Sequence, residues 1–119
     1  MFCVKTRHLV RATVVCCAIV SVAGAWSASA KDAKDRGEKV FADQKCALCH
    51  SVDGKGNKKG PLDEVGSKLS SDDIRAWITD AKGMTAKTQA TRKPAMKQFN
   101  LPKDDVDALV GYLSAMKKK

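Results

Sequence analysis

The chain has 119 residues, with 22 basic and 13 acidic side chains and a formal net charge of +9. This length fits one small domain and excludes a multidomain protein. Domains this small often need a disulfide, a metal or a cofactor for stability, so the five cysteines and two histidines are the first residues to consider as a binding site.

Residues 1–30 have the three-part pattern of a secretory signal peptide. Residues 1–11 carry three basic residues and no acid, residues 12–26 form an apolar run, and Ala28-Ser29-Ala30 places small residues where signal peptidase needs them. A retained membrane anchor would need about 20 predominantly apolar residues, and this run is shorter. We therefore predict cleavage after Ala30, no permanent membrane anchor, and a mature periplasmic domain of residues 31–119.

Cleavage would change the inventory of charges and ligands. The mature chain would keep 19 basic and 13 acidic residues, a net charge of +6. His8 and three cysteines would leave with the signal peptide, so that Cys46, Cys49 and His50 remain. Nucleic acid is a poor fit as a partner, because the chain is exported and has no nucleic-acid-binding motif.

Residues 31–45 predict a helix with Val40 and Phe41 as its apolar patch. Gly37 interrupts this helix at a cost of about 1 kcal/mol relative to alanine. It is either a tolerated defect or a point of close approach by another backbone. The C-terminal helix is the candidate neighbour, and we favour the close approach.

The middle of the chain alternates loops with one helix. Residues 51–66 are rich in glycine and predict a loop. Ser70 predicts a helix N-cap with Asp73 as its capping-box partner, and that helix extends to about Asp80. Its apolar face comprises Ile74, Trp77 and Ile78. Residues 81–101 have no periodicity and predict a long irregular segment.

The last helix has the clearest pattern. Its apolar residues fall at i, i+3, i+4 and i+7: Val106, Leu109, Val110 and Leu113. Asp104 and Asp105 lie in its first turn and lysines 117–119 follow its last, as the helix dipole favours. The chain has no convincing strand pattern and no internal repeat, so the predicted fold is all-α, with three to four helices.

Cys46-Ala47-Leu48-Cys49-His50 matches the C-x-x-C-H pattern of c-type haem attachment. Two cysteines three residues apart at a helix end can form thioethers with the two vinyl groups on one porphyrin edge. The next imidazole then lies beneath the ring, where it can bind the iron. We predict one covalent haem c held by Cys46, Cys49 and His50.

Three other interpretations of the motif are weaker. A thioredoxin-like dithiol requires a βαβ framework that the sequence lacks. A structural zinc site usually has four ligands, whereas three Cys and His residues remain after cleavage. A plain Cys46–Cys49 disulfide suits an oxidising compartment but leaves His50 without a role.

The second axial ligand is expected to be a methionine, because no second histidine remains in the mature chain. The candidates are Met84, Met96 and Met116, and core filling is the alternative role for each. Met116 ends the last helix, where core filling is the better interpretation. Met96 is preceded by Pro94 and lies just before the last helix, so we favour it over Met84. Histidine–methionine ligation fills both axial positions, which argues against an enzyme.

The mature chain resembles the class I monohaem c-type cytochromes, small all-α bundles around one haem. The matching residues are Gly37, Phe41, Cys46–His50, Gly60-Pro61-Leu62, Trp77, Met96 and Leu109–Leu113 with Tyr112. The resemblance implies that the Pro61 carbonyl holds the ligand histidine, and that Gly37 meets Tyr112. It also implies that Trp77 packs by the haem near a propionate; core packing is the alternative. Relatives often have proline directly after the ligand methionine, whereas Lys97 follows Met96.

The resemblance implies a soluble periplasmic carrier of single electrons. The alternative is a dedicated cytochrome subunit of a periplasmic dehydrogenase or sulfur-oxidising complex; a haem-based gas sensor or peroxidase is more distant. Basic residues crowd the regions expected around the haem: Lys55, Lys58, Lys59, Lys68, Lys82, Lys87, Arg92, Lys93 and Lys97. These residues either keep the protein soluble or steer an acidic redox partner. The protein is expected to be a monomer or a subunit of a redox complex.

Overall fold

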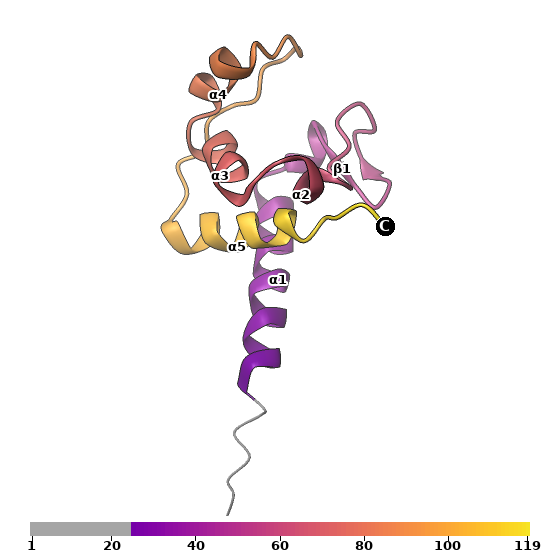
Figure 1. Cartoon of the computed structure of the whole chain (residues 1–119), viewed down its shortest axis with the longest axis vertical. Helices are drawn as coiled ribbons and strands as arrows, with labels where there is room; N and C mark the ends of the chain where they lie inside the picture. The colour runs from indigo at the N-terminus through magenta and orange to yellow at the C-terminus, as the bar shows by residue number, and fades with distance from the viewer. Residues whose placement is uncertain (1–24) are drawn as a thin grey trace, which may run out of the picture.

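The computed structural model describes residues 25–119, which are predominantly helical (Figure 1). The elements in chain order are α1 (Ala25–Asp43), the 3-10 helix η1 (Cys46–Leu48), β1 (Ser51–Val52), β2 (Lys55–Gly56), α2 (Val65–Lys68), α3 (Ser71–Thr79), α4 (Ala81–Thr88) and α5 (Lys103–Ser114). The predicted all-α fold is confirmed. The α-helices number five in the described residues, against the three to four predicted, because α2 and α4 add to the three for which the sequence predicted ranges.

The predicted signal peptide, residues 1–30, lies outside the described residues except for its last six, which begin α1. Its cleavage stays a prediction. Among residues 25–119, no helix combines the length and apolar character that a membrane span requires.

Helix α5 lies across α1, and this crossing organises the domain (Figure 1). Gly37 is buried there, and a Cβ atom at this position would overlap the Ala108 carbonyl oxygen and the Tyr112 Cβ. One turn along α1, the Phe41 and Tyr112 rings pack with their centroids 6.1 Å apart and tilted by 57°. The predicted close approach at Gly37 is therefore confirmed.

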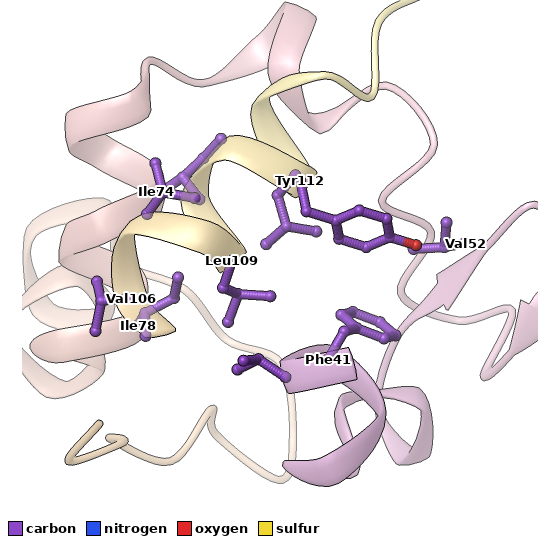
Figure 2. Packing of buried hydrophobic residues seen from close by; sticks show 10 residues of the cluster. Phe41, Val52, Ile74, Ile78, Val106, Leu109 and Tyr112 are labelled. Carbon is purple, nitrogen blue, oxygen red and sulfur yellow. The ribbon is translucent and has the colours of Figure 1, made fainter. Parts of the chain in front are cut away.

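The buried core lies between α1, α3 and α5 (Figure 2). Its members are Val40, Phe41, Val52, Ile74, Ile78, Val106, Leu109, Val110, Tyr112 and Leu113. Figure 2 shows Ile74 and Ile78 of α3 near Val106 and Leu109 of α5, with Phe41 and Tyr112 toward the β1 side. The four apolar positions predicted for the last helix are all buried.

Two helices of the middle region depend on polar caps. Ser70 accepts a hydrogen bond from the Asp73 N–H at 3.1 Å and donates its hydroxyl to the Asp73 carboxylate at 2.7 Å. The predicted cap is confirmed. The irregular segment predicted for residues 81–101 is wrong in its first part, where α4 forms. Asp80 caps that helix by accepting from the Gly83 N–H at 3.0 Å, and the helix is too short to show apolar periodicity.

The loop predicted for residues 51–66 contains a two-stranded hairpin. Ser51 pairs with Gly56 and Val52 with Lys55, around a turn in which Asp53 and Gly54 both have positive φ. Asp-Gly between two short extended segments is a recognised hairpin signal. The expectation of no strand was therefore wrong, although each strand has two residues.

We expect Gly37→Ala to destabilise the folded protein, because the added methyl group would force α1 away from α5. Overpacking of this kind costs about 1–3 kcal/mol. The matched control is Gly111→Ala in α5, where a Cβ would meet no atom within 4 Å. That substitution should stabilise the helix by up to about 1 kcal/mol. Urea unfolding of the mature protein measures both, and equal stabilities would contradict the close approach.

Candidate functional site

The end of α1 brings the two cysteines and the histidine into one turn. After α1, Lys45 adopts a left-handed conformation (φ 56°) and turns the chain into η1. The backbone N–H groups of Cys49 and His50 both donate to the Cys46 carbonyl, at 3.1 and 2.9 Å. This turn fixes the backbone spacing of the three residues before any cofactor is considered.

Both thiols are free in the structure. Cys46 is half-buried and packs against the core, whereas Cys49 is exposed. Burial raises the pKa of the Cys46 thiol, an effect opposed in part by the charge of Lys97. No Cys46–Cys49 disulfide forms, and residues 25–119 hold no group of three or more His, Cys, Asp or Glu side chains able to bind a metal ion.

The imidazole of His50 is held by a backbone carbonyl. Its Nδ1 lies 3.2 Å from the carbonyl oxygen of Gly60. A carbonyl accepts hydrogen bonds, so this geometry selects the tautomer with the proton on Nδ1 and leaves the Nε2 lone pair free. Burial lowers the pKa of His50, the Gly60 bond opposes this, and the charge of Arg92 lowers it further. A neutral imidazole with a free Nε2 is the form that binds a metal.

The acceptor differs by one residue from the one expected. The resemblance assigned this role to the Pro61 carbonyl, but in the structure the Gly60 carbonyl fills it. The reason is a parallel bridge between Ser51 and Pro61. The Ser51 N–H donates to Gly60 at 3.0 Å, and the Leu62 N–H donates to Ser51 at 2.8 Å. Successive carbonyls of an extended segment alternate in direction, so that of Gly60 faces His50.

The irregular segment that carries Met96 is shorter than predicted and is fixed at two points. We call residues 89–102 the strap. Near its start, Nη2 of Arg92 donates a hydrogen bond to the Cys49 carbonyl. Near its end, the Phe99 N–H donates to the Ile78 carbonyl at 3.0 Å and Phe99 packs against the core. Met96 is half-buried between these points.

The other two methionines occupy different surroundings. Met84 is buried on α4, at 6% exposure, within a regular helix. Met116 follows α5 and packs against the core, consistent with core filling. Trp77 of α3 is half-buried and lies neither in the core cluster nor among the residues packed against it. Core packing therefore does not account for Trp77.

Comparison with known proteins decides the family. A family model described as Cytochrome c matches residues 34–117, well over half of the chain. The chain belongs to the cytochrome c family. It is thus a c-type cytochrome with a role in electron transfer, and its family binds haem c.

One curated relative of the cytochrome is a "Cytochrome c oxidase subunit 2" from Alkalihalophilus pseudofirmus. The two are 27% identical over 92 residues, which is 70% of this chain but 25% of the relative. The cytochrome therefore spans about a quarter of that protein's length. No solved structure matches it.

The residues of the turn fit haem c. Two free thiols and a neutral imidazole with its Nε2 available lie within five consecutive positions, which is the donor set that this cofactor requires. Sequence reasoning missed two contributors to the site. The role of the Gly60 carbonyl depends on the register of the bridge between Ser51 and Pro61, which no local sequence pattern predicts. Arg92 had been noted for its charge alone, and its contact with Cys49 spans 43 residues of sequence.

Proposed function

We propose that the cytochrome carries single electrons in the periplasm with one haem c, after removal of residues 1–30. In this proposal Cys46 and Cys49 form the thioethers, and His50 and Met96 are the axial ligands of the iron. The observation that carries it is the hydrogen bond from His50 Nδ1 to the Gly60 carbonyl, in the same turn as two free thiols. A hydrogen bond from the ring nitrogen that does not bind the metal fixes a ligand imidazole and raises its basicity.

The ligand pair supports electron transfer rather than catalysis. Bound haem c supplies a one-electron couple between ferric and ferrous iron, and histidine–methionine ligation raises its potential. With both axial positions filled by protein, no position would remain open for oxygen or peroxide. Trp77 on α3 is proposed to pack beside the haem ring, because it is half-buried and does not pack against the core.

The surface around the attachment turn supports an acidic redox partner. Leu48, inside the motif, is 71% exposed and is the one large exposed apolar side chain of the described part. Exposed lysines flank it in sequence and in the strap: Lys45, Lys55, Lys58, Lys59 and Lys97. Not every predicted cation belongs to this group, since Lys68 pairs with Glu64 at 3.3 Å and Lys82 and Lys87 lie on α4. We propose that this surface, the Leu48 surface, docks the partner through charge and one apolar contact.

The second candidate function is that of a dedicated subunit within a larger redox complex. The relative named above favours it, because that protein is by name an oxidase subunit and the match lies in a quarter of its length. In this case the Leu48 surface would be covered permanently rather than visited by diffusing partners.

Purification of the native cytochrome at two salt concentrations tests both functions. The carrier should associate with redox proteins at low salt and elute alone at high salt, because exposed charge pairs are screened. It should titrate as a one-electron couple, with a slope of about 59 mV per tenfold change in the ratio of oxidised to reduced protein. Co-elution with a large subunit at high salt would instead establish the subunit role. A protein without haem would refute both functions.

A further inference from the structure

The backbone carbonyl of Cys49 needs a partner from outside its own turn. Carbonyls at the end of a helical turn have no hydrogen-bond donor within it. No backbone N–H group of residues 25–119 donates to the Cys49 carbonyl. Nη2 of Arg92, 43 positions further along the chain, donates to it. A guanidinium stays charged throughout the physiological pH range, and a charged donor forms a stronger hydrogen bond than a neutral one.

Gly60 makes room for this contact. A Cβ atom at Gly60 would overlap both Nη1 of Arg92 and the Cys49 carbonyl oxygen. The carbonyl of the same glycine accepts from His50 Nδ1 at 3.2 Å. The guanidinium of Arg92 thus lies against the two segments that form the histidine side of the site.

Arg92 is also the first of the two anchors of the strap. The second anchor is Phe99, through its N–H bond to Ile78 at 3.0 Å and its packing on the core. The Nζ of Lys97 lies 5.0 Å from the centre of the Phe99 ring and adds a cation–π contact at that end. Met96 lies four residues after the first anchor and three before the second. Loss of the first would leave the strap free from the end of α4 to Met96.

We propose, building on the haem ligation proposed above, that Arg92 is a positioning residue that clamps the strap to the haem-attachment turn. By closing the strap, it keeps Met96 within reach of the iron and opposes its replacement by an external ligand. Arg92 itself touches neither iron nor partner in this role; it acts through the position of Met96.

Binding of imidazole to the ferric holoprotein measures the clamp. Added imidazole has to displace the internal methionine, so its apparent affinity rises with the fraction of molecules in which the strap is open. In Arg92→Gln the apparent affinity for imidazole should rise about three- to tenfold, the factor expected when an exposed hydrogen bond with a charged donor is lost. The far-red charge-transfer band of methionine-bound ferric haem should fade at a lower temperature than in the wild type. Arg92→Lys, which retains a charged donor, should recover part of the loss.

Lys93→Gln is the matched control. Lys93 is the next residue of the strap, its side chain is exposed, and it takes part in none of the ion pairs of residues 25–119. The variant loses the same charge and should bind imidazole as the wild type does. Equal affinities for Arg92→Gln and Lys93→Gln would overturn the clamp.

The wild-type protein provides a second test in case Arg92→Gln does not mature. In the ferrous holoprotein, nitrogen-15 NMR should show distinct Arg92 guanidinium signals that rotate and exchange slowly, because the group is bonded to a carbonyl. One averaged, rapidly exchanging signal would overturn the clamp while leaving the ligand assignment intact. Failure of the proposed function looks different, since the wild type would then lack covalent haem or the methionine band.

Discussion

Replacement of both Cys46 and Cys49 by serine should abolish covalent haem in the cytochrome. Serine is nearly isosteric with cysteine, but its hydroxyl forms no thioether with a vinyl group. Matured in a host that attaches haem c, the wild type should keep haem stain on a denaturing gel. The double variant should show none, and its mass should equal that of the bare mature polypeptide. We also expect a lower helical signal in circular dichroism, because a domain this small depends on its cofactor.

The control for this experiment is Ala47→Ser, between the two cysteines. Ala47 is exposed, so the variant adds a hydroxyl to the same turn while leaving both thiols. It should retain haem stain and the mass of the haem-bound form. Stain retained by the double variant would refute the thioether assignment, and stain lost in Ala47→Ser would show that the turn, rather than its sulfur atoms, had been disturbed.

Short-range patterns gave the attachment motif and the helix crossing. The five residues Cys46–His50 are consecutive, so their chemistry does not depend on how the rest of the chain folds. The apolar period of α5 predicted its buried face correctly, because side chains three to four residues apart lie on the same face of a helix. Gly37 was predictable for a related reason, since a glycine inside an otherwise regular helix costs stability unless something requires the space.

Long-range register and weak local patterns explain what sequence reasoning missed. The choice of Gly60 over Pro61 depends on how residues 51 and 61 pair, and a shift of one residue reverses the carbonyl direction. Helix α4 buries only Ala81 and Met84, too few to show an apolar period. Arg92 reaches Cys49 across 43 positions, and no local pattern predicts such a contact.

Alanine substitution of the two methionines of the middle region should affect two different properties, the axial ligation of the iron and the stability of the fold. Met96 is half-buried on the strap, between the anchors at Arg92 and Phe99, whereas Met84 is buried at 6% exposure in α4. Met96→Ala should lose the far-red band of the ferric protein entirely and let the ferrous protein bind carbon monoxide at neutral pH. Met84→Ala should keep the band but lose about 2–5 kcal/mol of unfolding free energy, as buried methionines do.

The two readouts separate a ligand from a core residue because each variant serves as the control for the other. Spectra of the oxidised proteins report the axial bond, and urea unfolding of the same samples reports packing. Loss of the band in Met84→Ala alone would transfer the ligand role to α4, and the strap would then be a surface loop. Carbon monoxide binding to the reduced wild type would go further, because it requires an open axial position. That result would indicate a ligand-binding haem protein instead of an electron carrier. The two classes differ in whether a protein side chain occupies the second axial position of the iron.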